Sequence, residues 1–448
     1  MNWRKPILRI LAAAQGTRIF PYYREILSYK TASREEIRRR TNEKLRRLLL
    51  HSWRQVPYYR DVLTRCGVVR NGTVELERFT QIPLLTKEII DRQADRLHSE
   101  DHRRRRSYSN TSGGSTGRPV QFLQDKRYDQ WNIATKLYFN ANLGKDLGQR
   151  ELKLWGSERD ILQGTVGLKE RLINFFYNRR FFNCYRFGTE QIESLIRLNN
   201  QFKPVIYWSY MEAAFELARY LQDHPRPFYS PQCLISTIGP LTEQVRATIE
   251  SALGCRVYNQ YGSREVGPIA CQCTEQKGLH SFPWWQYLEL IDNDSGLPIA
   301  EGQGQVVITT LENYSMPLIR YAIGDAAALD AGVCPCGVQT PILKEVLGRT
   351  LGYFKKADGT KVHSHFLVQA LFHKRWIRRF QIIQTDSNRV VFRIENARPQ
   401  EPPGSDLEEI AEKTRILMGP ACRTEFEFVE SIQPTAGGKM MYTISQVQ

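Results

Sequence analysis

Residues 110–119 read NTSGGSTGRP, a stretch of small hydroxyl side chains and glycines that ends in an arginine and a proline. Glycine is costly to order and adds nothing to a core, so the stretch is either a flexible surface loop or a place where backbone approaches a ligand closely. Successive backbone N–H groups in such a loop can bind a polyphosphate, and Ser115 and Thr116 add hydroxyl donors. The stretch lacks the Gly-Lys-Ser/Thr ending of a P-loop, which excludes that class of nucleotide-binding proteins.

The composition of the chain is that of a globular protein with more than one domain. Of its 448 residues, 41% are hydrophobic and 25% are charged, and this length favours two or three domains. No apolar run reaches the roughly 18 residues that a membrane-spanning helix needs, and the N-terminal apolar stretch is too short to be a good signal peptide. Nine cysteines, an odd number without a secretory signal, predict a reducing, cytoplasmic location.

The formal net charge is +16, and arginine supplies much of it, with a run at residues 103–106. A positive field of this size fits either nucleic-acid binding or a solvated basic surface that attracts small anions such as nucleotides. No nucleic-acid-binding motif accompanies the charge. We therefore expect the second alternative and no nucleic-acid partner.

Three patterns follow one another along the chain. The first hundred or so residues show helical spacing of apolar side chains, with Thr31 and Ser33 as plausible caps and Pro57 as a helix stop. From about residue 120, strand-like and helical runs alternate, which predicts an α/β fold with a largely parallel sheet and then a β-rich subdomain. The last hundred or so residues predict a small α+β domain. We place the boundary so that residues 1–347 form the large domain and residues 348–448 the small one.

Four further motifs follow the first stretch in a fixed order: YNQYGSRE at 258–265, RYAIGD at 320–325, GR at 348–349 and PTAGGK at 434–439. In this order and at these separations they resemble the motifs of the adenylate-forming enzymes, which include acyl- and aryl-CoA synthetases, peptide-synthetase adenylation domains and luciferases. The VPYYR segment, the YGSREVG variant and the CPCG pair resemble the phenylacetate–CoA ligase and capsule-biosynthesis (CapK-type) branch. The resemblance covers nearly the whole chain.

This resemblance implies a role for each motif. The Ser/Thr/Gly loop would cradle the β- and γ-phosphates of ATP, and Glu265 would hold Mg²⁺ against phosphate oxygens. Tyr261 would stack on adenine, while Asp325 would accept hydrogen bonds from the ribose. Lys439 would span the substrate carboxylate and the α-phosphate. The catalytic set implied is Lys439, Arg264 and Glu265, and the ATP-binding set is Ser112, Gly114, Ser115, Thr116, Gly117, Gly239, Pro240, Tyr261, Gly262, Ser263, Asp325 and Arg349.

The sequence departs from the superfamily pattern at several positions. Gly113 stands where many relatives carry another hydroxyl, and Arg264 replaces the usual threonine and is expected to contact the α-phosphate in its place. The acidic hinge residue that usually follows GR is also absent, because residues 350–352 read TLG. A glycine there still permits a hinge between the two domains.

Two pairs of cysteines lie on either side of a β-rich stretch. Cys273, His280, Cys334 and Cys336 supply three thiols and one imidazole, the ligand types of a structural zinc site, with Cys271 as a substitute for Cys273. The C-x-C spacing is tighter than the commoner C-x-x-C, and buried free cysteines are the alternative interpretation. A zinc ion with four protein ligands would be structural, because no coordination position stays open for substrate.

The expected reaction is ATP-dependent ligation. Mg²⁺–ATP and a small carboxylic acid would give an acyl-adenylate and pyrophosphate, and the acyl group would then pass to coenzyme A or, alternatively, to an amine. Trp155, Trp208 and Tyr210 could line an aromatic acid pocket, but we expect them to belong to the core. A different class, a non-catalytic nucleotide or nucleic-acid binder, stays open at this point. The presence of Glu265, Asp325 and Lys439 together argues against it.

Overall fold

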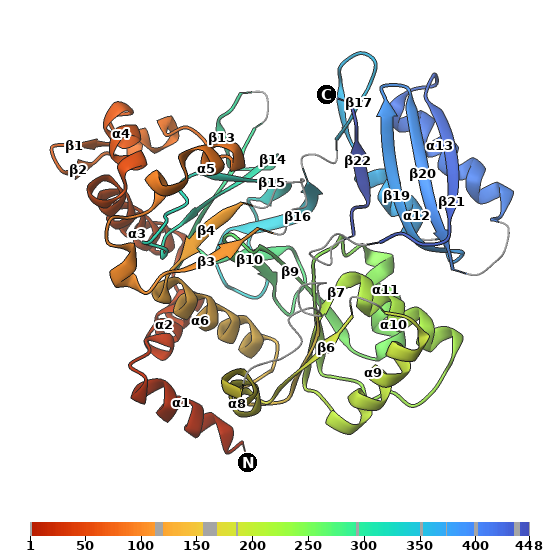
Figure 1. Ribbon diagram of the computed structural model, residues 1–448, viewed down its shortest axis with the longest axis horizontal. Helices are drawn as coiled ribbons and strands as arrows, with labels where there is room; N and C mark the ends of the chain where they lie inside the picture. The colour runs from red at the N-terminus through yellow and green to blue at the C-terminus, as the bar shows by residue number, and fades with distance from the viewer. Residues whose placement is uncertain are drawn as a thin grey trace.

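The computed structural model describes residues 2–112, 120–155, 168–184, 187–292, 295–349, 353–372, 374–397, 402–433 and 440–447 (Figure 1). The N-terminal part is helical, as the apolar spacing predicts. Ser33 caps the long helix α3 by accepting a hydrogen bond from the Glu36 backbone N–H, and Pro57 occupies the first turn of α4. The helices are α1 (Arg4–Ala14), α2 (Ile19–Leu27), α3 (Arg34–Gln55), α4 (Pro57–Arg65) and α5 (Lys87–Gln93), with 3₁₀ turns at Ser28–Lys30, Leu76–Gln81, Ala94–Leu97 and His102–Arg105.

A mixed sheet of 12 strands forms the centre of the molecule, in the order β13-β12-β14-β15-β16-β11-β10-β9-β8-β7-β5-β6. The neighbouring strands β6, β5, β7, β8 and β9 pair in parallel. Because β9 pairs with β10 antiparallel, β9 is the junction between a parallel half and an antiparallel half of the sheet. The parallel half comprises β5 (Glu151–Trp155), β6 (Arg179–Asn183), β7 (Ile206–Tyr210), β8 (Cys233–Thr237) and β9 (Arg256–Ser263). The α/β prediction with a β-rich subdomain is confirmed.

Helices cover both faces of the parallel half because its central strands are apolar on both sides. Every residue of β7 and β8 is buried. Leu152 and Leu154 of β5 pack into one cluster with α9 (Thr189–Phe202), α10 (Met211–Asp223) and α11 (Glu243–Leu253). A second cluster, on the side of α6 (Lys126–Asn142), includes Trp208 and Trp284. Helix α8 (Leu168–Tyr177) precedes β6.

The antiparallel half packs against the N-terminal helices through a third cluster of buried side chains, which includes Leu45, Leu49 and Tyr321. The hairpin of β3 (Tyr108–Thr111) and β4 (Gln121–Gln124) lies next to it (Figure 1). The remaining strands of this half are β10 (Gly267–Gln272), β11 (Leu279–Ser281), β12 (Gln286–Ile291), β13 (Pro298–Ile299), β14 (Gly302–Thr310), β15 (Tyr321–Asp330) and β16 (Ile342–Arg349), and a separate small hairpin joins β1 (Val69–Arg70) to β2 (Thr73–Val74).

The C-terminal part has a sheet and a core of its own, drawn in blue in Figure 1. Its sheet has the order β21-β20-β19-β22 and includes the buried residues Ile382 and Phe392. Strand β16 continues through residues 347 and 348, where the sequence predicts the domain boundary. The position of this boundary stays a prediction. The elements are β17 (Tyr353–Lys355), β18 (Lys361–His363), α12 (His365–Phe372), β19 (Ile377–Asp386), β20 (Arg389–Asn396), α13 (Gly404–Met418), β21 (Arg423–Val429) and β22 (Thr443–Ser445).

None of the helices in the described ranges has the length and apolar character needed to cross a membrane. All nine cysteines lie within these ranges, and each is a free thiol.

Candidate nucleotide site and metal centre

The YGSRE motif forms the end of β9 and the turn into β10, at the junction of the two halves of the sheet. Gly262 is required there, because a Cβ would come within 2.6 Å of the Gly267 carbonyl oxygen on the paired strand. The Glu265 side chain is buried, with 7% of its surface exposed. Within the described residues, no hydrogen-bond donor or cation pairs with its carboxylate. A carboxylate supplies the oxygen ligands that Mg²⁺ prefers, so the residue present fits the ion that the sequence predicts.

Two contacts connect this turn to the β3–β4 hairpin. The Arg264 guanidinium donates to the Thr111 carbonyl oxygen at 3.4 Å. The Gln124 amide donates to the carbonyl oxygens of Arg264 and Glu265, at 3.1 and 3.3 Å. The YGSRE turn therefore lies beside the strand that leads into the Ser/Thr/Gly stretch. Sequence reasoning missed Gln124, which carries no motif and acts only through its position on β4.

Ser112 closes the base of the hairpin. Its backbone N–H donates to the Val120 carbonyl oxygen, and its hydroxyl accepts from the Val120 N–H, both at 2.9 Å. The second bond uses the hydroxyl oxygen as an acceptor within the hairpin. The role of Ser112 in ATP binding stays a prediction. The predicted site residues Gly114, Ser115, Thr116, Gly117 and Lys439 lie outside the described residues.

Two predicted nucleotide residues from distant motifs contact each other directly. The Tyr261 hydroxyl donates to Asp325 Oδ2 at 2.8 Å, so the phenol orients the carboxylate. Asp325 lies on β15, where the Arg349 backbone of β16 is its register partner. Gly324, just before it, has φ +82°, a conformation that favours glycine. Tyr261, Asp325 and the Arg349 backbone therefore meet at one place, although they lie far apart in the sequence.

The segment after β8 brings Gly239 and Pro240 to the carboxyl edge of the parallel strands, the edge at which ligands bind in open α/β sheets. Gly239 has φ +115°, and a Cβ there would lie 3.0 Å from Glu212 Oε1 and 3.2 Å from Met211 Cβ. Glycine is therefore required by both backbone conformation and space. Ser263 ends β9 at the same edge of the sheet.

Trp208 and Tyr210 pack in the core as expected, whereas Trp155 is half-buried and packs against it. Trp208 and Tyr210 are 4% and 6% exposed, and the rings of Trp155 and Tyr210 lie 4.6 Å apart.

The cysteine and histidine side chains predicted to bind zinc come together. One ligand atom from each of Cys273, His280, Cys334 and Cys336 lies within 4.8 Å of the others. The sulfurs of Cys273 and Cys334 are 3.5 Å apart, and Cys336 Sγ is 3.4 Å from His280 Nε2. A tetrahedral zinc ion with bonds of about 2.0–2.3 Å would separate its ligand atoms by roughly 3.5–3.8 Å.

The second nitrogen of the histidine also fits a metal ligand. His280 Nδ1 lies 3.1 Å from the Thr340 hydroxyl, which orients the ring so that Nε2 faces the cysteines. The prediction that Cys271 could replace Cys273 as a zinc ligand is wrong, because Cys273 and not Cys271 belongs to this group. It lies on β10, packs into the core beside α6 and is 3% exposed. In a continuous strand, Cys271 and Cys273 would point to the same face of the sheet. Because β10 ends at Gln272, Cys273 is not bound by this alternation.

Comparisons with known proteins agree with this architecture. Residues 354–446 match the CapK C-terminal domain family. Protein CapK of Staphylococcus aureus is 22% identical over 84% of this chain and 82% of its own length. The phenylacetate–coenzyme A ligase of Thermus thermophilus is 28% identical over 72% of each chain.

Among solved structures, 2-hydroxyisobutyryl-CoA ligase in its postadenylation state superposes with a TM-score of 0.74, at 18% identity, over 93% of this chain and 91% of that one. The thioesterification state of the same protein gives 0.59. The shared architecture, with the nucleotide motifs at the junction of its sheet, is the fold of the adenylate-forming CoA ligases with a small C-terminal domain. Its sequence relatives include CapK and the phenylacetate–CoA ligases.

Proposed function

We propose that this protein is an AMP-forming ligase that activates a small carboxylic acid as its acyl-adenylate and transfers the acyl group to coenzyme A. Two contacts carry the proposal, that of Tyr261 with Asp325 and that of Arg264 with Thr111, because they connect residues of three separate motifs. The similarity to phenylacetate–CoA ligases supports the thiol acceptor. A cytoplasmic location accords with nine free cysteines.

Each side chain has a distinct task in this reaction. Asp325, held by the Tyr261 hydroxyl, would accept the ribose hydroxyls, and the Tyr261 ring would stack on adenine. Arg264 would offset charge at the α-phosphate as the carboxylate attacks. Glu265 would hold Mg²⁺, which when bound neutralises phosphate charge. Lys439 would align the two anionic reactants, since attack on an anionic phosphorus depends mainly on positioning and charge.

Acid-dependent ATP–pyrophosphate exchange tests the first half-reaction. A panel of aryl, hydroxy, fatty and amino acids is assayed with wild-type protein, Lys439→Ala and the matched control Lys413→Ala, which removes a partly exposed lysine of α13 that pairs with Glu409. We expect exchange with at least one acid, loss of roughly a hundredfold or more in Lys439→Ala, and wild-type rates in Lys413→Ala. Exchange in none of the acids, with ATP still bound, would favour a non-catalytic nucleotide binder.

The acceptor is assayed with the active acid. Coenzyme A or a panel of amines is added, and the products are identified by mass spectrometry. A thioester supports the proposal. An amide without a thioester would assign the amine alternative instead.

We also propose that Cys273, His280, Cys334 and Cys336 bind a structural Zn²⁺. The ligand distances and the Thr340 contact to His280 support it. The ion would stabilise the strands between Glu265 and Asp325, which both belong to the nucleotide site.

Protein purified without added zinc should contain about one zinc per chain, and Cys336→Ser should lose most of it. The control Cys66→Ser alters a free cysteine of the N-terminal helical part and should retain the metal. Cobalt-substituted protein should show the absorption of a tetrahedral thiolate site. Absence of zinc together with unchanged thermal stability in Cys336→Ser would contradict the proposal.

A further inference from the structure

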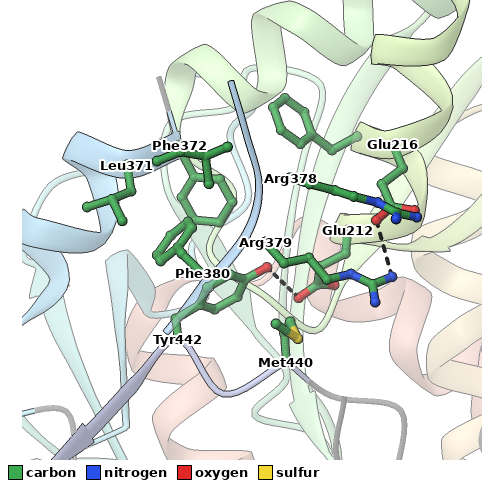
Figure 2. A pocket seen from close by; sticks show the side chains of 11 residues that line it. Glu212, Glu216, Leu371, Phe372, Arg378, Arg379, Phe380, Met440 and Tyr442 are labelled. Atoms are coloured by element: carbon green, nitrogen blue, oxygen red, sulfur yellow. Dashed lines mark hydrogen bonds and ion pairs between the residues drawn. The ribbon is translucent and has the colours of Figure 1, made fainter. Parts of the chain in front are cut away.

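Helix α10 of the large domain forms a pocket with the C-terminal part of the chain (Figure 2). From α10 come Glu212, Phe215 and Glu216, and from the other side come residues of α12, of β19 and of the segment that begins at Met440. This segment follows directly after Lys439. The pocket therefore lies where the chain that carries the predicted catalytic lysine meets the large domain.

Tyr442 connects the two sides. Its hydroxyl donates to Glu212 Oε1 at 3.0 Å, and its ring lies 5.1 Å from the rings of Phe372 and Phe380 (Figure 2). Its carbonyl oxygen accepts from the Ile382 N–H of β19 at 2.8 Å. The aromatic contacts and the backbone bond fix Tyr442 to the C-terminal sheet, so the hydroxyl is the part that reaches across to α10.

Glu212 touches the nucleotide segment with the same carboxylate. Its Oε1 lies only 3.0 Å from the position that a Cβ would take on Gly239, a predicted ATP-binding residue. The preceding residue, Met211, donates its N–H to the Ile238 carbonyl oxygen at 3.4 Å. Glu212 therefore lies between Gly239, a predicted ATP-binding residue, and the segment that directly follows Lys439.

Other contacts hold the C-terminal part against α10 but are remote from Lys439 in sequence. Arg379 of β19 pairs with Glu216 at 3.3 Å (Figure 2), and Arg219 donates to the Ile377 carbonyl oxygen at 2.6 Å. These bonds place β19 on α10. The Tyr442–Glu212 bond adds a contact between α10 and the segment that directly follows Lys439.

We propose that Tyr442 and Glu212 are positioning residues that hold the segment beginning at Met440, directly after Lys439, against α10 for adenylation, which rests on the proposed function. All these contacts require α10 and the C-terminal sheet to face each other, so any rotation of the C-terminal part away from α10 breaks the Tyr442–Glu212 bond. The closer superposition with a postadenylation state than with a thioesterification state accords with this. The bond serves the first half-reaction and is absent from the second.

The test separates the two half-reactions. Tyr442→Phe removes the hydroxyl and keeps the ring, and it should lower kcat for ATP–pyrophosphate exchange by roughly 10-fold while KM for ATP stays within about 2-fold. Thioester formation from supplied acyl-adenylate and coenzyme A should keep its rate. The matched control Tyr207→Phe deletes a buried hydroxyl that donates to Asn199, far from the pocket, and should not show this split.

Glu212→Ala should give the same split, and Glu212→Gln, whose amide oxygen still accepts from Tyr442, should recover most of the loss. The Tyr442→Phe and Glu212→Ala effects should not add, because they remove one interaction. Equal losses in both half-reactions, or unchanged exchange in Tyr442→Phe, would overturn the proposal.

A further measurement distinguishes failure of this inference from failure of the proposed function. If wild-type protein exchanges pyrophosphate with no acid, the proposed function fails. The positioning bond is then measured by hydrogen–deuterium exchange of residues 440–447 in the presence of ATP. Faster exchange in Tyr442→Phe than in wild type supports the bond, and equal exchange overturns it.

Discussion

The carboxyl group of Glu212 should make the stability of the protein depend on pH near neutrality. Desolvation raises its pKa from the usual 4.5 to about 7, against the opposing effect of the hydrogen bond from Tyr442. The charged groups that face it are Glu216 of α10, which raises the pKa further, and Arg379 of β19, which lowers it. Because the folded pKa is the higher one, the folded protein favours the protonated form. Its stabilising effect is complete below pH 4.5 and is lost as the pH rises through about 7.

The magnitude follows from the size of this shift. A shift from 4.5 to about 7 corresponds to an upper bound of about 3 kcal/mol. The side chain is only partly buried, so solvent screening reduces the expected effect to about 2 kcal/mol. Glu212→Gln has nearly the same shape and cannot titrate. Relative to this variant, wild-type protein should therefore lose about 2 kcal/mol of unfolding free energy between about pH 5 and pH 8.

Urea unfolding of both proteins at the two pH values measures the difference, because all other titrating groups are common to both. The control Glu190→Gln changes an exposed carboxylate on α9 and should show no comparable pH-dependent difference. A difference between wild type and Glu212→Gln that stays constant with pH would refute the reasoning. So would a difference that grows toward acid pH.

Three further predictions concern other parts of the molecule. Gly262→Ala places a Cβ 2.6 Å from a backbone oxygen and should lower stability by about 1–3 kcal/mol in thermal unfolding and weaken ATP binding, whereas Gly404→Ala, with no atom within 4 Å, should be neutral. Glu312→Ala removes one of the two carboxylates that pair with Lys44, which is 6% exposed and keeps Glu25 at 2.9 Å, so it should cost about 1–3 kcal/mol by urea unfolding. Glu43→Ala removes an exposed pair with Arg39 and should cost under about 1 kcal/mol in the same assay. Asp325→Ala should raise KM for ATP in pyrophosphate exchange by roughly 10-fold or more, and Tyr261→Phe, which keeps the ring and removes the bond to Asp325, by less. An unchanged KM in Asp325→Ala would contradict the ribose role.

The zinc ligands illustrate where sequence reasoning reached its limit. The residue types and their pairing predict a zinc site, but they do not separate Cys271 from Cys273. The choice depends on where β10 ends and on the register that pairs Cys271 with His280 of β11. The orienting contact from Thr340 to His280 carries no local signal at all.

The nucleotide site shows the same division. The order of the motifs predicts Tyr261, Glu265 and Asp325 as its members, and the structure brings Tyr261 and Asp325 into direct contact. Gln124 was missed, because its amide acts only through its place on the β3–β4 hairpin beside the Arg264–Glu265 turn. Glu212 and Tyr442 were missed for a related reason: they meet across 230 positions of the chain.

The sequence by itself determined the elements and their class. The Ser33 cap, the Pro57 stop and the fully buried strands β7 and β8 follow from local hydrogen bonding and from the largely apolar composition of these strands. Only the tertiary structure decided that one carboxylate, Glu212, lies against both Gly239 and Tyr442. The physical reason is that local propensity depends on neighbours within a few residues. The meeting of distant side chains instead depends on how helices and sheets pack, which no short stretch of sequence encodes.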